Sequence, residues 1–187
     1  MKKLRILIAD DHGLVRRGAV EVLRARNGWR VVGEAANGRE AVEKAIKLKP
    51  DVAILDIGMP ELDGFEATQQ IVEAVPDTKV LVLTMHESDQ MVRRALDAGA
   101  RGYLLKSDFT EYLAKAVKAI AAGKRFLTPK VSEIVLDGFL RTKNEHERKD
   151  QRSTRTTPRE MEIIRLLAQG EVQQGDRGAT WNHGQDG

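Results

Sequence analysis

The chain has 187 residues, a formal net charge of +3 and no cysteine. This length suits one ordinary domain plus a smaller unit, and the missing thiols exclude disulfides, thiolate metal sites and cysteine nucleophiles. The opening run "MKKLRILIADDHG" ends in two aspartates, which excludes a signal peptide or a membrane span there. Because the lack of cysteine also fits a reducing compartment, we expect a cytoplasmic protein with no membrane partner.

Residues 1–123 alternate between short apolar runs and stretches with an apolar residue about every 3.6 positions. The apolar runs predict strands at 4–9, 30–35, 51–56, 79–84 and 101–106. The periodic stretches predict helices at 13–25, 38–49, 63–75, 88–99 and 109–123. Regular alternation of this kind predicts an α/β fold with a five-stranded parallel sheet covered by helices on both faces.

Residues 124–155 are typical of a linker. Pro129 suits a first helical turn, and the apolar residues that follow it predict a helix near 128–140. The next stretch, "NEHERKDQRSTR", is basic and almost free of apolar residues, so we expect a mobile, solvated segment, with contact to nucleic acid as the alternative. A further helix is predicted within residues 156–170, "TTPREMEIIRLLAQG", with Thr157 as its N-cap.

Charged and hydroxyl side chains stand where the predicted strands end. These residues are Asp10 and Asp11, Asp56, Thr84, and Lys106. Since the carboxyl ends of parallel strands meet at one edge of the sheet, we expect these side chains to lie together. Clustered carboxylates without histidine or cysteine ligands select a hard cation such as Mg²⁺, and a flanking lysine and hydroxyl can hold phosphoryl oxygens. Asp56 is central and can serve as a carboxylate nucleophile.

Each of these residues also has an ordinary alternative role. Asp10 and Asp11 could cap a helix, and Lys106 could be a surface charge. His12 and His86 lie close by in sequence, and we interpret both as supporting or structural residues. The occurrence of all five of these residues at strand ends favours a phosphoryl-transfer site over a separate explanation for each residue.

Four segments, "ILIADDH", "DVAILDIGMPELDG", "VLVLTMHE" and "GYLLKSD", resemble in order and spacing the receiver domain of two-component response regulators. The resemblance covers about residues 1–123 and implies a flavodoxin-like (βα)5 fold. It implies that Asp56 is the phospho-acceptor for a sensor histidine kinase. It also implies a Mg²⁺ site formed by Asp10, Asp11, Asp56 and the main-chain carbonyl of Gly58.

The same resemblance gives roles to residues of the last two strands. Lys106 pairs with the phosphoryl group, Thr84 turns its hydroxyl toward it, and the ring of Tyr103 moves with Thr84 as a switch. Many receivers have a cis proline after the lysine. Here Ser107 follows Lys106, so the isomer of this peptide bond stays open.

The segment "TTPREMEIIRLLAQG" resembles the first helix of the LuxR-type helix-turn-helix domain in NarL/FixJ regulators. That family continues with a scaffold helix and a recognition helix for the major groove, whereas residues 171–187 have no apolar periodicity. If one extra base entered the gene near the Gly170 codon, the original frame could encode GKSNKEIAGQLGTTVKT, which is close to the family pattern. We therefore expect a disordered, out-of-frame tail at 171–187 and loss of specific DNA binding. A genuine C-terminal extension is the alternative.

Three functions follow from these observations. The favoured one is a response regulator that accepts a phosphoryl group, can form a homodimer and descends from a DNA-binding transcription regulator. The second is a stand-alone receiver that acts through protein contacts. The third is a phosphatase with an aspartate nucleophile, of the haloacid dehalogenase-like type. It is disfavoured because such enzymes typically carry a second carboxylate two residues after the nucleophile, where this chain has Gly58.

Overall fold

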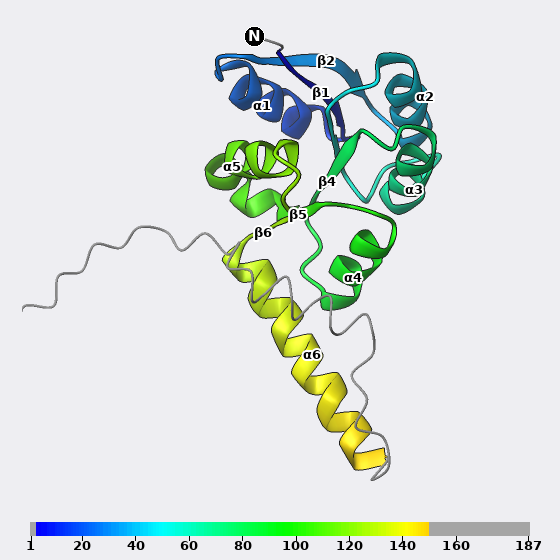
Figure 1. Ribbon diagram of the computed structural model, residues 1–187, viewed down its shortest axis with the longest axis vertical. Helices are drawn as coiled ribbons and strands as arrows, with labels where there is room; N and C mark the ends of the chain where they lie inside the picture. The colour runs from blue at the N-terminus through cyan, green and yellow to red at the C-terminus, as the bar shows by residue number, and fades with distance from the viewer. Residues whose placement is uncertain (1–2, 150–187) are drawn as a thin grey trace, which may run out of the picture.

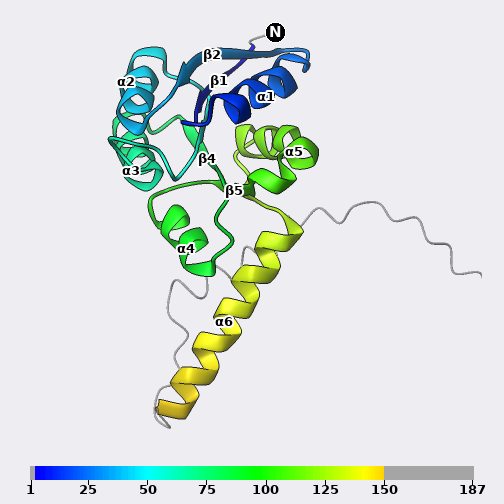
Figure 2. The ribbon, with the colours of Figure 1, turned by 180° about the vertical axis from the view of Figure 1, so that it is seen from behind.

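The computed structural model describes residues 3–149, which contain one parallel sheet with helices on both faces (Figures 1 and 2). The strand order is β2-β1-β3-β4-β5-β6. The strands are β1 (Leu4–Ala9), β2 (Trp29–Ala35), β3 (Val52–Leu55), β4 (Lys79–Thr84), β5 (Gly102–Leu105) and β6 (Phe126–Leu127). The helices are α1 (Gly13–Arg24), α2 (Gly38–Leu48), α3 (Gly64–Ala74), α4 (Asp89–Asp97), α5 (Phe109–Ala121) and α6 (Pro129–Lys149), with a 3-10 turn at Lys106–Asp108. The order of the first five strands is the flavodoxin-like one and confirms the predicted fold class.

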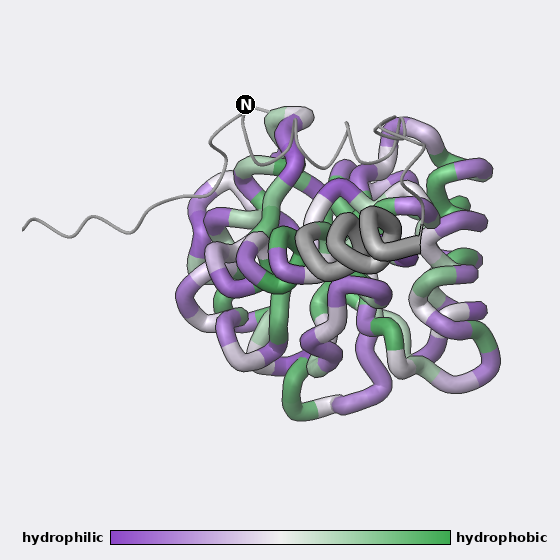
Figure 3. Tube along the Cα trace, turned by 90° about the horizontal axis from the view of Figure 1, so that it is seen from below, coloured by the Kyte–Doolittle hydropathy of each residue, from purple (hydrophilic) through white to green (hydrophobic). Residues whose placement is uncertain are grey.

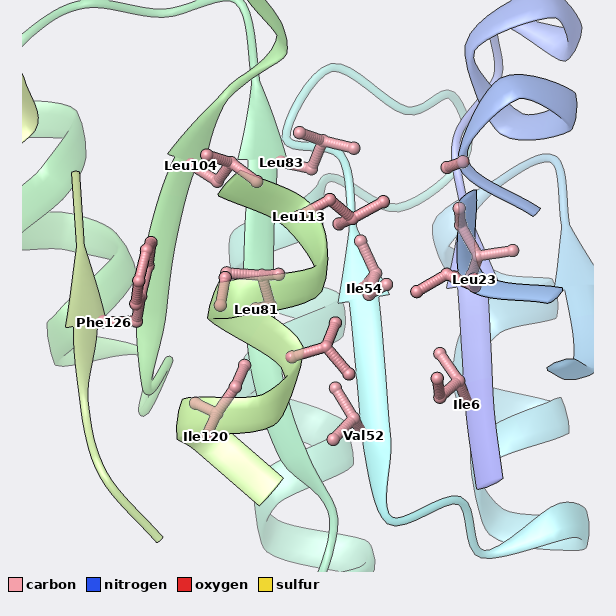
Figure 4. Packing of buried hydrophobic residues seen from close by; sticks show 14 of the residues in the cluster. Ile6, Leu23, Val52, Ile54, Leu81, Leu83, Leu104, Leu113, Ile120 and Phe126 are labelled. Atoms are coloured by element: carbon pink, nitrogen blue, oxygen red, sulfur yellow. The ribbon is translucent and has the colours of Figure 1, made fainter. Parts of the chain in front are cut away.

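The strands are apolar on both sides because both faces of the sheet are buried. On β1, Ile6 and Ile8 point into a cluster formed with α1 and α5, which Figure 4 shows from close by. The alternate residues Leu7 and Ala9 point into a second cluster, formed with α2 and α3. The helices carry hydrophobic positions interspersed with hydrophilic ones, in keeping with one packed and one solvent-facing side (Figure 3). Neighbouring strands pair in parallel, so the carboxyl ends of β1, β3, β4 and β5 meet at one edge.

The segment after Gly123 is part of the domain core, whereas we expected a linker. Phe126 and Leu127 form the short strand β6, which pairs in parallel with Gly102 and Tyr103 of β5. The predicted helix at 128–140 is present as α6, and its Val131 and Val135 are buried together with residues of α4 and β5. The apolar face that predicted a helix is the face that packs against the domain, although the sequence did not show what it packs against.

The end of α6 also differs from expectation. The helix continues to Lys149, into the charged stretch that we expected to be mobile from residue 144. Glutamate, lysine and arginine are good helix formers, and a helix that is already nucleated by docking propagates through them at low cost. No helix within residues 3–149 is long and apolar enough to cross a membrane. The predicted helix within 156–170 and the tail at 171–187 lie outside the described residues.

Replacing Val131 with alanine tests whether α6 belongs to the core. Val131 is fully buried, whereas Leu136, on the same helix, is 41% exposed. We expect Val131→Ala to lower the free energy of unfolding in urea by about 2 kcal/mol, because it removes buried apolar surface and leaves a cavity. Leu136→Ala should cost less than about 0.5 kcal/mol. Equal losses for the two variants would show that α6 does not pack as described.

Candidate functional site

Lys106 joins two buried carboxylates at the carboxyl edge of the sheet. Its Nζ lies 2.7 Å from Asp56 Oδ2 and 2.8 Å from Asp10 Oδ2. Asp10 follows β1, Asp56 follows β3, and Lys106 follows β5, so the contact ties together the ends of three strands. All three side chains are almost completely buried. The structure thus brings these predicted site residues together as the strand order requires.

The position of Asp56 depends on the loop that leads into α3. The main-chain N–H of Ile57 donates to Asp56 Oδ1 at 2.8 Å, which orients the carboxylate. The N–H of Gly64, the first residue of α3, donates to the carbonyl of Ile57 at 3.0 Å. A Cβ atom at Gly64 would lie 2.0 Å from the carbonyl oxygen of Asp56, so only glycine allows α3 to begin this close to the end of β3. Gly64 is therefore needed for the close approach of α3 to Asp56.

The loop after β1 holds the other acidic side chains. Asp10 Oδ1 accepts a hydrogen bond of 2.9 Å from the main-chain N–H of His12, and the His12 Nδ1 lies 2.7 Å from Asp11 Oδ1. Arg16 donates to the main-chain carbonyl of Asp10 at 2.5 Å, and its Nε lies 3.4 Å from a carboxylate oxygen of Glu34 on β2. The loop is therefore fixed both from α1 and from β2.

Burial and ion pairing act in opposite directions on the charged groups of this site. Burial raises the pKa of Asp10 more than its hydrogen bonds with Lys106 and His12 lower it, and the nearby charge of Asp56 raises it further. Burial alone would lower the pKa of Lys106, but its contacts with Asp10 and Asp56 outweigh burial and raise it. Lys106 therefore stays charged at neutral pH. Ionisation of Asp10, in contrast, lowers the stability of the folded protein.

The acidic side chains have the geometry of a cation site. Carboxylate oxygens of Asp10, Asp11 and Asp56, together with a nitrogen of His12, all lie within 4.8 Å of one another. A Cβ atom at Gly58 would lie 3.9 Å from Asp56 Oδ2, so the main chain of Gly58 runs beside the same pocket. Carboxylate and carbonyl oxygens are the ligands that Mg²⁺ prefers. The donor set fits the predicted metal, and its positive charge would offset the cost of ionised Asp10.

Thr84 and Tyr103 are connected through the backbone of one residue. Thr84 Oγ1 accepts a hydrogen bond of 3.3 Å from the main-chain N–H of His86. The hydroxyl of Tyr103 donates to the main-chain carbonyl of His86 at 2.8 Å. Both side chains are fully buried, and burial raises the pKa of Tyr103, so its hydroxyl remains a donor at neutral pH. The Lys106–Ser107 peptide, whose isomer the sequence left open, is trans.

Sequence patterns did not identify every residue that shapes this site. Arg16 was not singled out, because an arginine on an exposed helix face carries no distinguishing signal. We interpreted His12 as a supporting residue, and the structure places its ring against Asp11. We gave His86 no specific role, yet its main chain, rather than its imidazole, makes the contacts to Thr84 and Tyr103. The sequence cannot reveal a role of this kind, because every residue type except proline has the same main-chain N–H and carbonyl groups.

Comparison with known proteins identifies the family of this chain. Residues 6–118 match the response regulator receiver domain. The chain belongs to the two-component response regulators. It is 38% identical over 167 residues to the response regulator protein VraR of Staphylococcus aureus, covering 89% of this chain and 77% of that protein. The match is longer than the receiver segment, so the similarity extends into the region after it. As a receiver the chain is a phosphoryl acceptor rather than an enzyme, and the phosphatase alternative is therefore not supported.

Solved structures give the same assignment. A LuxR-family response regulator from Aurantimonas is 33% identical with a TM-score of 0.71, covering 74% of this chain and 99% of that one. The receiver domain of NarL from Mycobacterium tuberculosis is 38% identical with a TM-score of 0.63, covering 66% of this chain and all of that one. The response regulator RcsB, in a complex with DNA, is 28% identical with a TM-score of 0.68, covering 90% of this chain and 78% of that one.

The raised pKa of Asp10 predicts how stability changes with pH. Since the folded protein holds this proton more tightly than the unfolded chain, ionisation of Asp10 opposes folding. The cost is absent below the ordinary carboxyl pKa and complete above the folded-state value. Without divalent cations, we expect Asp10→Asn to be more stable than the parent at about pH 7, by more than the ~0.5 kcal/mol of a surface substitution. The difference should shrink as the pH falls toward about 4.

Asp11→Asn is the matched control for this measurement in urea. The Asp11 side chain is 32% exposed, so its replacement should change stability less. A difference for Asp10→Asn that stayed constant from acid to neutral pH would contradict the electrostatic account.

Proposed function

We propose that Asp56 accepts a phosphoryl group from a sensor histidine kinase and that the chain descends from a regulator that passes this signal to a DNA-binding output. The observation that supports the proposal most is the contact of Lys106 with both Asp10 and Asp56, 2.8 Å and 2.7 Å long. This contact places the Lys106 ammonium group, which is charged at neutral pH, against the carboxylate that would react. A cytoplasmic location, expected from the sequence, is part of the same proposal.

A divalent cation would bind to Asp10, Asp11, Asp56 and the main-chain carbonyl of Gly58, and we propose Mg²⁺ on the basis of the oxygen donors. When bound, it neutralises charge on the phosphoryl oxygens and on the clustered carboxylates. His12 lies at the rim of this donor set and orients Asp11 through its contact of 2.7 Å.

The chain's own residues then account for the transfer. A carboxylate oxygen of Asp56 attacks phosphorus, and the phosphorus–nitrogen bond to the donor imidazole breaks with its electron pair returning to the imidazole. Lys106 shifts its hydrogen bonds from the Asp56 carboxylate to the phosphoryl oxygens, which carry more negative charge. Thr84 can turn its hydroxyl to the same group. Position and charge, rather than acid–base catalysis, supply the rate.

The proposed output is transcription regulation. The similarity to VraR extends past the receiver, which favours a two-domain regulator over a stand-alone receiver. RcsB, a structural relative, forms a complex with DNA. The segment from Thr157 resembles the first helix of such a domain. A homodimer would present two of these units to two half-sites.

Intact-mass measurement after incubation with acetyl phosphate and Mg²⁺ tests the acceptor. We expect the addition of one phosphoryl group per chain. The group should not be added when the metal is chelated before the reaction, and it should be absent in Asp56→Asn. Asp63→Asn is the matched control. Asp63 lies in the same loop but caps α3, accepting hydrogen bonds of 2.8 Å from Phe65 and Glu66, so this variant should still be modified. Full modification of Asp56→Asn would rule out Asp56 as the acceptor.

We further propose that residues 171–187 are read out of frame, because the codons that they allow are compatible with the sequence expected of a helix-turn-helix. Removal of one base near codon 170 should restore an open frame and give a protein that shifts a promoter fragment in a gel at physiological salt. The chain with its present tail should shift that fragment less, because residues 171–187 lack the apolar periodicity of the scaffold and recognition helices. A shifted frame interrupted by stop codons would contradict this explanation.

A further inference from the structure

The turn at Glu61 is strained, and it lies in the loop that joins β3 to α3. Glu61 has a φ of 65°, and it is one of two non-glycine residues within 3–149 with a positive φ. The main-chain N–H of Leu62 donates to the carbonyl of Pro60 at 2.8 Å, which closes a three-residue turn around Glu61. Turns of this hand are rare because the central side chain crowds its own main chain. Such strain persists only where neighbouring contacts hold it.

The first turn of α2 supplies these contacts, and α2 lies beside α3 in both views of the ribbon (Figures 1 and 2). The side-chain amide of Asn37 donates to Glu61 Oε1 at 2.8 Å, and Arg39 Nε lies 3.8 Å from Glu61 Oε2. A Cβ atom at Gly38 would lie 2.0 Å from the carbonyl oxygen of Leu62, so the two backbones touch. Arg39 and Glu61 are both more than half exposed, so their ion pair contributes little. Asn37 is therefore the side chain that fixes Glu61.

Asn37 is itself fixed by the helix that it begins. It is the N-cap of α2, and its Oδ1 accepts a hydrogen bond of 2.7 Å from the main-chain N–H of Glu40. The Glu40 carboxylate in turn accepts one of 2.8 Å from the main-chain N–H of Ala36. The oxygen of the Asn37 amide is thus used within α2, and its nitrogen is used across to the loop. The amide joins a rigid helix end to the strained turn.

The stretch between Glu61 and the acidic pocket has little conformational freedom. It consists of Met59, which is 6% exposed, and Pro60, whose ring fixes its φ. These two residues lead back to Gly58, where a Cβ atom would lie 3.9 Å from Asp56 Oδ2. Because the residues between them cannot absorb a change, the position of Glu61 determines the position of Gly58.

We propose that Asn37 is a positioning residue for the cation site, because it holds the Glu61 turn and so keeps the Gly58 carbonyl at the pocket. The inference rests on the proposed function, in which this carbonyl binds Mg²⁺. Without the Asn37 contact, Glu61 relaxes to a negative φ, and the carbonyl has to be returned to the pocket whenever the cation binds. The free energy of that return is subtracted from the free energy of binding, so the affinity for the cation falls.

Asn37→Asp tests this role, because aspartate is as good an N-cap as asparagine but repels Glu61 instead of donating to it. We expect the Mg²⁺ dissociation constant of the full chain, from titration of its backbone amide NMR signals, to rise by the factor of about 3 to 10 that one net hydrogen bond supplies. The added negative charge alone would lower this constant. An unchanged or lower dissociation constant, or a parent chain that binds no Mg²⁺, would overturn the inference.

A double variant separates the contact from the helix cap. Asn37→Asp combined with Glu61→Gln swaps donor and acceptor and keeps the net charge of the parent, so the hydrogen bond can form again. Most of the lost affinity should return, and a loss that persisted would overturn the inference. Asn27→Asp is the matched control. Asn27 also precedes a glycine and its replacement adds the same charge, but it lies exposed in the turn between α1 and β2, so Mg²⁺ binding should not weaken.

The rate of modification by acetyl phosphate separates this inference from the proposed function. At limiting Mg²⁺, Asn37→Asp should be modified more slowly than the parent. At saturating Mg²⁺ the two rates should agree, because the variant changes the affinity for the cation and leaves Asp56 in place. A deficit that remained at saturation would overturn the role of Asn37 while leaving Asp56 as the acceptor. A parent chain that is not modified on Asp56 would refute the proposed function, and the Mg²⁺ titrations would still decide the role of Asn37.

Discussion

The pairing of one buried lysine with two buried carboxylates is the constraint on which this structure depends. Burying a carboxylate without a partner costs several kcal/mol, and here two lie side by side at the ends of β1 and β3. Lys106 is the cation among the described residues that reaches both, and it stands at the end of β5. The strand order brings the three side chains together, and a further cation bound beside them would balance more of this charge.

The surrounding loops are built to keep that arrangement rigid. Gly64 lets α3 begin directly against the backbone of Asp56, and Gly38 lets α2 begin against the carbonyl of Leu62 in the same loop, where a Cβ atom would lie 2.0 Å away. On the other side of the pocket Arg16 holds the carbonyl of Asp10. A carboxylate fixed in this way would have little conformational freedom to lose in a reaction, so the site could contribute to rate without a base.

The sequence predicted the sheet, its helices and the position of the pocket because these depend on local patterns. Apolar runs such as 79–84 mark buried strands, and residues such as Asp56 and Lys106 follow the strands directly. The strand β6 and the docking of α6 could not be predicted in the same way. Two residues are too few to show a period, and the partner of an amphipathic helix depends on tertiary packing. The contacts of His86 use main-chain groups, which every residue carries.

The two sides of the sheet differ in what they can transmit. The α1 and α5 side is packed with aliphatic residues such as Leu23, Leu113 and Ile120, whose contacts are non-directional and tolerate small shifts (Figure 4). The α4 and α6 side contains directional contacts, from Thr84 and Tyr103 to His86 and from Glu87 to Lys130. A hydrogen bond weakens steeply with angle and distance, so a sub-ångström change in the pocket changes its energy. These directional contacts make the α4 and α6 side the more sensitive of the two to a change of charge at the sheet edge.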